Sequence, residues 1–236
     1  MNKSIGLLIS FVIAAVAHGV SHADNNVYSG PFFMCPDAHG EEQKNLFKII
    51  DISRFPMRID TLGQLRVDGF AASLAASRSA EMATAPEPTV DEKIGEQIQK
   101  LQQMAAPLSQ NFDQRYVEIC FATQAPPKDQ NIDGPFYYMP GFIIQTAITG
   151  VLQPMDSVIV PQQLYHVLSY EGPTSEIGNL RFTLTEQFWQ KTAPYLGLER
   201  ADGPNIQIFA PGLKGTEEQT KLELWTPIKP IKIWPR

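Results

Sequence analysis

The succession of strand and helix patterns in the second half of the chain constrains the fold more than any other feature of the sequence. Residues 163–170 are rich in β-forming side chains, and Pro161 and Gly172 bound them, which predicts a strand. Residues 174–195 follow with apolar side chains at steps of three and four, as on one face of a helix. Gly197 comes directly after this stretch and is expected to end the helix.

Two more strands complete this unit. Residues 205–209 and 221–226 are short runs of β-forming side chains. Pro227 is expected to end the second run, because proline cannot donate a hydrogen bond to a neighbouring strand. The predicted order of the elements is therefore β-α-β-β.

The first half shows the same order less clearly. Strand patterns occupy residues 46–52, 116–121 and 136–146. Between the first two, Thr89 is a suitable helix N-cap and Glu92 completes a capping box. The apolar face of the helix that follows consists of Ile94, Ile98, Leu101, Ala105 and Leu108.

Two such units predict an α+β fold in which each helix covers a largely antiparallel sheet, with a groove between the uncovered faces. The predicted boundaries are residues 44–150 for the first β-α-β-β repeat, 151–230 for the second and 231–236 for a C-terminal tail. Residues 63–88 are rich in Ala and Ser. This stretch of the first repeat is either a further strand, an inserted loop, or both.

The N-terminus has the pattern of a bacterial secretory signal. Lys3 precedes an apolar run at residues 5–17, and small residues stand before a cleavage site that ends at Ala23. The run is shorter than the roughly 20 residues that a membrane-spanning helix needs. We therefore expect residues 1–23 to be removed and residues 24–43 to form an N-terminal extension; the alternative is a retained anchor. The expected location is the periplasm or the medium.

The two cysteines, Cys35 and Cys120, form a disulfide under this interpretation, because exported proteins meet an oxidising environment. The alternative is a pair of buried thiols. Two cysteines are too few for a disulfide-dense miniprotein, a multi-cysteine zinc protein or an iron–sulfur protein.

Composition and motifs argue against several other classes. Hydrophobic residues make up 43% of the chain and charged residues 19%, which is typical of a globular protein. The formal net charge of −6 argues against nucleic acid as a partner. The sequence has no zinc-protease, nucleophile-elbow or phosphate-loop motif, and His39 and His166 stand far apart. We therefore expect no metal and no cofactor.

Several segments of the second unit match the pattern of one family: residues 160–161, 165–173 and 175–178, the helix with Phe188-Trp189, and residues 206–209 and 223–229. The most specific are Gly172-Pro173 near the start of the helix and Glu223-Leu-Trp-Thr-Pro-Ile-Lys229 at the end of the unit. In these segments the second unit resembles the GyrI-like small-molecule-binding domain, which is also the effector-binding part of AraC-type and MerR-type multidrug regulators. The resemblance covers residues 158–230 well and residues 44–148 by the order of elements.

The resemblance implies a duplicated fold with a ligand cleft between the repeats. It also implies binding of amphipathic, often cationic compounds, and some members resemble hydrolases of reactive small molecules. We therefore expect an exported small-molecule-binding protein. The alternatives are a hydrolase that uses Glu223 and a groove tyrosine, and a module that contacts a protein of the cell envelope.

The alternation of residues 221–226 suggests which side chains serve the cleft. Leu222 and Leu224 share one strand face, which suits the helix-covered core, whereas Glu223 and Trp225 share the other. A carboxylate beside an aromatic ring attracts an organic cation. The same carboxylate, with its pKa raised by burial, would suit general acid–base catalysis. The alternative is a surface glutamate on an edge strand.

Aromatic residues provide further candidates for the ligand-binding surface. Phe136 and Tyr138 face one side of their predicted strand. Tyr165 and Tyr170 fall on opposite faces of theirs, so at most one of them faces the groove. Ordinary packing in the core is the alternative role for all four.

A cleaved signal predicts a mature chain that begins at Asp24. N-terminal sequencing of the protein recovered from the exported fraction is expected to start at this residue. Recovery of the exported protein with Met1 in place would contradict the signal.

Overall fold

The structure is a computed structural model, and it describes residues 26–33, 47–74, 90–108, 112–123, 136–144, 154–210 and 219–231. The predicted signal, Cys35, Thr89 and the last five residues of the predicted tail lie outside these ranges. No helix in the described ranges is long and apolar enough to cross a membrane.

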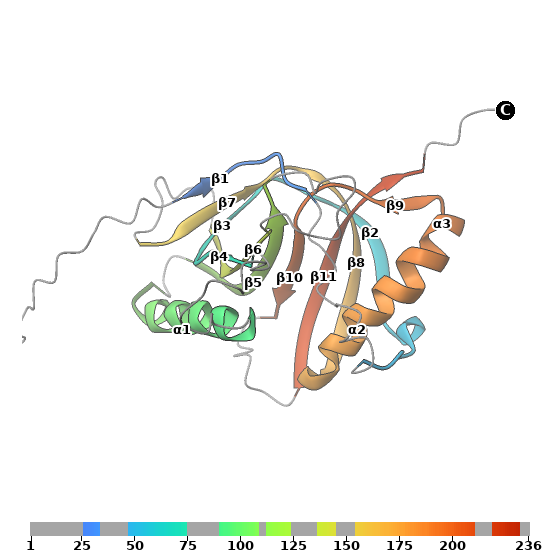
Figure 1. The fold of residues 1–236 in the computed structure, drawn as a ribbon, viewed down its shortest axis with the longest axis horizontal. Coiled ribbons are helices and arrows are strands. Elements are labelled where there is room, and N and C mark those ends of the chain that lie inside the picture. Colours follow the sequence, from blue (N-terminus) through green and yellow to red (C-terminus); the bar gives the residue numbers. More distant parts are fainter. Residues whose placement is uncertain are drawn as a thin grey trace, which may run out of the picture.

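The fold is mixed α and β, built on one mostly antiparallel sheet (Figure 1). Its strands, in spatial order, are β1 (Val27–Tyr28), β7 (Asp156–Val160), β3 (Leu65–Gly69), β6 (Phe136–Ile144), β5 (Phe112–Ala122), β10 (Asn205–Phe209), β11 (Gln219–Pro230), β8 (Gln163–Pro173) and β2 (Met57–Leu62). Two short strands lie off this path: β4 (Ala72–Ser73) pairs with β6, and β9 (Leu198–Arg200) pairs with β11. Only the pairing of β1 with β7 is parallel among the described strands.

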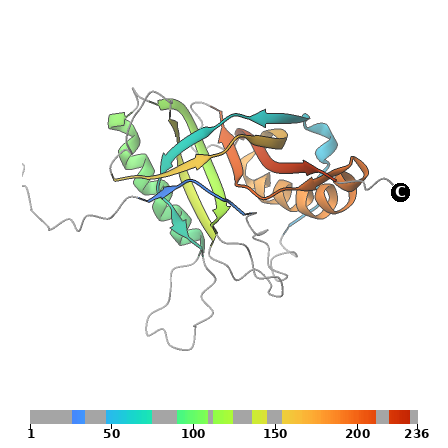
Figure 2. The ribbon, with the colours of Figure 1, turned by 90° about the horizontal axis from the view of Figure 1, so that it is seen from above.

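Helices α1 and α2 lie over different halves of this sheet (Figure 2). Helix α1 spans Val90–Leu108. The second helical run begins with a 3₁₀ turn, η3 (Thr174–Glu176), and continues through α2 (Ile177–Thr183), a π-helical stretch η4 (Leu184–Thr192) and α3 (Ala193–Tyr195). Gly197 follows with a φ of 70°, a conformation that favours glycine. Both predicted helices are thus present, and a further 3₁₀ turn, η2, spans Ile52–Arg54.

The register of the sheet shows that both helices cover the same face. Tyr138, which packs against Ile94 of α1, lies opposite Cys120. Leu224, which packs in the cluster with the helical run, lies opposite Gln207, and Gln207 lies opposite Glu118. Glu118 and Cys120 are two residues apart on one strand and therefore face the same way.

The other face of the sheet, which the helices leave free, carries a hydrophobic core of its own. Val117, Ile119 and Phe121 of β5 are fully buried there. Tyr28 and Phe32 of the N-terminal segment pack edge-on against Phe121, with ring centroids 5.1 and 5.4 Å away. In the half of the molecule that contains β5, the helix-free face is therefore packed as a core and does not form the groove that we expected between two uncovered faces. The pairing of β5 with β10 instead joins both halves into one sheet.

Two predicted strand boundaries are wrong. Residues 47–50, expected as part of a strand, have no regular structure. The backbone N–H groups of Lys48 and Ile50 donate to Asn179 Oδ1 and Thr183 Oγ1 of α2, at 2.8 and 3.0 Å. Side chains of helix α2 thus accept the backbone hydrogen bonds that a neighbouring strand would otherwise accept.

Pro227 does not end its strand, because β11 changes neighbours there. The ladder with β8 ends at Pro227, and pairing with β9 begins at Ile228. The Pro227 carbonyl accepts a hydrogen bond from Ala201 N at 2.9 Å. The missing proline N–H therefore falls where one ladder gives way to the next.

The other strand predictions hold in outline. The strand patterns at 116–121, 136–146, 163–170 and 205–209 correspond to β5, β6, β8 and β10. Strands β1, β2, β7 and β9 were not anticipated. Within residues 63–88 the structure contains β3 and β4, and residues 75–88 lie outside the described ranges.

Cys120 is half-buried on β5, opposite Tyr138, and it is not a free thiol. Because Cys35 lies outside the described ranges, the Cys35–Cys120 bridge stays a prediction.

His166 is a buried, uncharged histidine. Its side chain on β8 is 4% exposed, and its ring lies 4.4 Å from that of Phe188 and 5.3 Å from that of Trp189, measured between centroids. Burial lowers the pKa of His166 to about 4. Protonation would place a charge among aromatic rings, where Nε2 has no hydrogen-bond partner in the described part of the chain.

We expect His166 to make the fold sensitive to acid. Its folded-state pKa lies below the value of about 6.5 in an unfolded chain, so the unfolded state takes up the proton more readily. The stabilisation is present above pH 6.5 and is lost as pH falls towards 4. Urea unfolding at pH 7 and 4.5 should show wild type losing about 2 kcal/mol more than His166→Phe. Equal losses in the two proteins would contradict this role.

A candidate ligand pocket beside Glu223

A pocket of about 870 Å³ opens where strands β8, β10 and β11 meet the segment that leads into β2. Small-molecule sites commonly enclose about 300–1,000 Å³. The described residues that line it are Arg54, Phe55, Pro56, Arg115, Ser169, Tyr170, Glu171, Gly172, Pro173, Glu176, Ile208, Phe209, Ala210, Lys221, Leu222 and Glu223.

Aromatic and aliphatic side chains form one part of the pocket wall. The rings of Phe55 and Tyr170 pack in a tilted pair with centroids 5.0 Å apart. The Tyr170 hydroxyl donates to the Pro173 carbonyl at 2.8 Å, which fixes the ring. A Cβ on Gly172 would lie 2.7 Å from that hydroxyl oxygen, so only glycine leaves room for it. The Gly172-Pro173 motif therefore shapes this wall.

Charged side chains stand at the rim in opposite-sign pairs. Arg54 Nη2 lies 3.2 Å from Glu176 Oε2, and Lys221 Nζ lies 3.2 Å from Glu171 Oε2. In the second pair both side chains are mostly exposed, at 66% and 74%, so that pair contributes little to stability. Arg54 also lies over the ring of Phe55, 4.6 Å from its centroid.

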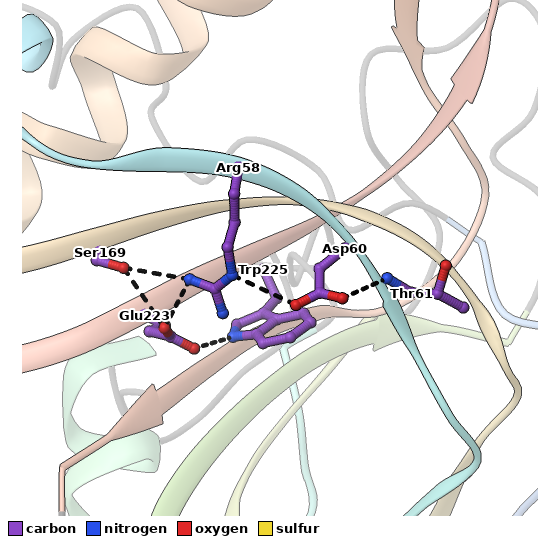
Figure 3. A network of polar contacts seen from close by, with 6 residues as sticks. All are labelled: Arg58, Asp60, Thr61, Ser169, Glu223 and Trp225. Carbon is purple, nitrogen blue, oxygen red and sulfur yellow. Dashed lines mark hydrogen bonds and ion pairs between the residues drawn. The ribbon is translucent and has the colours of Figure 1, made fainter.

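Glu223 anchors a network on the helix-free face of the sheet (Figure 3). Arg58 Nη1 of β2 donates to Glu223 Oε1 at 2.8 Å, and Trp225 Nε1 donates to Oε2 at 3.0 Å. The Ser169 hydroxyl lies 3.4 Å from both Glu223 Oε1 and Arg58 Nη1. Arg58 Nε donates in turn to Asp60 Oδ2 at 3.3 Å. The carboxylate of Glu223 thus has a partner at each oxygen.

The network keeps Glu223 ionised. Burial alone would raise the pKa of Glu223, but the hydrogen bond and charge of Arg58, together with the hydrogen bonds of Trp225 and Ser169, lower it below its usual value. A general acid needs a carboxyl pKa that is raised towards the working pH. This carboxylate is therefore unsuited to that role, in contrast to the raised pKa expected from the sequence.

The sequence prediction placed the two faces of β11 correctly. Leu222 and Leu224 pack in the cluster of the helical run, and Glu223 and Trp225 meet on the other face. Trp225 is only 7% exposed and belongs to the core there, beside Tyr165, whose ring centroid is 5.8 Å away. Neither ring lines the pocket.

The remaining aromatic candidates lie in different parts of the molecule. Tyr170 lines the pocket, and Tyr165 is fully buried on the opposite face of β8, as the alternation predicts. Tyr138 and Phe136 lie in the other half of the molecule, in the cluster beneath α1. The structure does not bring these two residues together with Glu223.

A second polar network was missed by the sequence prediction. It lies at the centre of the sheet, on the face that carries the helices. Tyr116 and Gln207 donate to Oε1 and Oε2 of Glu118, at 3.0 and 3.2 Å, and Arg181 Nη2 lies 3.6 Å from Oε2. Burial, then the charge of Glu118, raises the pKa of Tyr116. These residues come from β5, β10 and α2, so no local motif could have indicated them.

Arg58 and Ser169 were missed for a similar reason. Residues 57–60 of β2 alternate between apolar and charged side chains, and charged side chains are common on exposed edge strands. Its pairing with β8, which brings Arg58 over Trp225, joins residues more than a hundred positions apart. The sequence pattern contains no signal for that pairing.

No protein-family model matches the chain, and no curated protein matches it in sequence. Similar solved structures include SAV2435 bound to tetraphenylphosphonium, with 16% identity over 74% of this chain and 94% of that one and a TM-score of 0.48. An integron cassette protein from Vibrio cholerae is 16% identical over 74% and 97%, with a TM-score of 0.48. The EcmrR C-terminal domain is 10% identical over 75% and 99%, with a TM-score of 0.47.

Glu223→Gln is expected to destabilise the fold by about 1 kcal/mol, because it removes a charge-assisted pair whose two side chains are only 42% and 34% exposed. Glu199→Gln is the matched control: its pair with Lys229 is more exposed, at 49% and 55%, and should matter little. Urea unfolding at pH 7 measures both. Equal effects of the two substitutions would show that the Arg58–Glu223 pair is no stronger than a surface pair.

Proposed function

We propose that this protein binds an amphipathic small molecule in the pocket beside Glu223. The observation that carries the proposal is the pocket itself: about 870 Å³ in volume, with Phe55, Tyr170 and Ile208 in its wall and paired charges at its rim. Ligand sites typically combine such apolar surface with a few fixed polar groups. The apolar side chains would hold the hydrocarbon part of a ligand, and the rim would orient its polar end.

The strand order supports a GyrI-like domain built from two repeats. The elements β3, α1, β5 and β6 come in this order in the first half, with the short strand β4 after β3, and their strands are adjacent in the sheet in the order β3-β6-β5. The elements β8, α2, β10 and β11 do the same in the second half, with the order β8-β11-β10. Strand β2 precedes the first set but pairs with β8, and β7 precedes the second set but pairs with β3. This arrangement supports two repeats that exchange their leading strands.

We infer further that the protein acts outside the cytoplasm. Support for this comes from the signal pattern of residues 1–23 and from Cys120, which is not a free thiol. A ligand of an exported binding protein is taken from the periplasm or the medium.

The geometry favours binding over hydrolysis. A hydrolase needs a proton donor or a base whose pKa lies near the working pH. Glu223 is held ionised by Arg58, and the Tyr170 hydroxyl is committed to the Pro173 carbonyl. Glu223 and Tyr170 therefore serve as fixed recognition groups, and neither suits the role of a general acid.

Calorimetric titration with triphenylphosphine oxide, a neutral aryl compound with one polar end, tests the pocket. We expect saturable binding to wild type and at least about a tenfold loss with Ala210→Trp, because the indole would fill the pocket beside Phe209. Ala201→Trp is the matched control, since Ala201 is also half-buried after a strand but lies outside the pocket. Absence of binding to wild type, or equal affinity for both variants, would rule out the proposed site.

A further inference from the structure

Arg58 holds a position that would suit a cationic ligand. Its guanidinium group lies over the indole ring of Trp225, 5.4 Å from the ring centroid, and 2.8 Å from the carboxylate of Glu223 (Figure 3). The face of an indole and an adjacent carboxylate are the two groups that attract organic cations most strongly in proteins. In this protein Arg58, from the edge strand β2, already contacts both the indole and the carboxylate.

We propose that Arg58 is a tethered cation that selects the ligands of the pocket: it excludes organic cations from Glu223 and Trp225 and leaves the pocket to neutral and anionic amphiphiles. This inference rests on the proposed function of the pocket. It names the class of ligand that the same site accepts.

The pairing of charges around the pocket supports this selectivity. Three carboxylates belong to the described lining, and each has a cation within ion-pair distance: Glu171 with Lys221, Glu176 with Arg54, and Glu223 with Arg58. An entering cation therefore finds no unpaired carboxylate among them. It gains a counter-charge only by breaking a pair, which offsets much of the attraction.

Of these pairs, that of Arg58 with Glu223 combines the face of an indole ring with a carboxylate that accepts a hydrogen bond from the same indole. It is also the least exposed, since its two side chains are 42% and 34% exposed. Coulomb attraction is stronger in such a partly desolvated site than at an open rim. Because Arg58 is covalently attached, it competes as an intramolecular partner at high effective concentration. A free cation must therefore outcompete a group that is always present.

Arg58 can nevertheless be displaced, because it belongs to the outermost strand in the described sheet order. Its side chain also contacts Asp60 on the same strand, which would keep a partner for the guanidinium if Glu223 were taken. Competition by Arg58 therefore weakens cation binding without blocking the pocket to other ligands.

The test compares two aryl ions of nearly the same shape and opposite charge, tetraphenylphosphonium and tetraphenylborate, by calorimetry at one fixed salt concentration. For Arg58→Gln we expect the affinity for tetraphenylphosphonium to rise about tenfold and that for tetraphenylborate to fall. Arg58→Lys keeps the positive charge, so its preference should stay close to that of wild type. Unfolding in urea checks that each variant is folded.

Two further variants separate local competition from a change in overall charge. Lys229→Gln removes one positive charge from β11 outside the pocket, and we expect it to leave the ratio of the two affinities unchanged. In Arg58→Gln/Glu223→Gln the vacated counter-charge is also gone, so the gain in phosphonium affinity should disappear. A gain that persists in the double variant would overturn the proposal.

The outcomes also distinguish this inference from the function on which it rests. If both ions bind wild type and Ala210→Trp weakens them, but Arg58→Gln leaves their ratio unchanged, the pocket stands and the role of Arg58 is wrong. If neither ion nor triphenylphosphine oxide binds wild type or Arg58→Gln, the proposed function fails, and the selectivity fails with it.

Discussion

The register of the three strands β2, β8 and β11 is the constraint on which the candidate site depends. Arg58 lies opposite Val167, and Val167 lies opposite Trp225, so a single row across the sheet brings a cation over an indole ring. The neighbouring pair on β8 and β11, Ser169 opposite Glu223, supplies the hydroxyl and the carboxylate. If one of these strands slipped by one residue, its side chains in the network would point to the helix-covered face. Val167 and Trp225 oppose such a slip, because it would remove them from the core that they fill on the helix-free face.

The sequence predicted those elements in which buried and exposed side chains recur at a regular spacing along the chain. The alternation of β11 gave its two faces, and the spacing of Leu180, Leu184 and Phe188 gave the buried side of the helical run, because each pattern is imposed by one neighbouring layer. The strand expected at 46–52 failed for a different reason. Its β-forming side chains are present, but Asn179 and Thr183 of a distant helix take the backbone hydrogen bonds that a neighbouring strand would need. The β-propensity of a segment shows that it can form a strand. Whether it does so depends on the groups that it contacts in the folded protein.

The same distinction explains which parts of the site could be predicted. Glu223 and Trp225 stand two residues apart on one strand, so alternation alone brings them together. Arg58 comes from an edge strand that pairs across more than a hundred residues, and without it Glu223 reads as an unpaired carboxylate. That one missing residue reverses two expectations: the pKa of Glu223 is lowered instead of raised, and its charge is compensated instead of available.

The pair of Arg58 and Glu223 therefore belongs to two equilibria at once. It ties the edge strand β2 to β11 across β8, and it fills the place of a cation beside the pocket. A ligand that takes Glu223 must release Arg58, and so it weakens the attachment of β2. By thermodynamic reciprocity, the attachment of β2 through Arg58 weakens the binding of that ligand to the same extent. A ligand that leaves the pair intact avoids this coupling. Under the proposed function, the fold therefore favours ligands that bind against the apolar wall over those that bind the carboxylate.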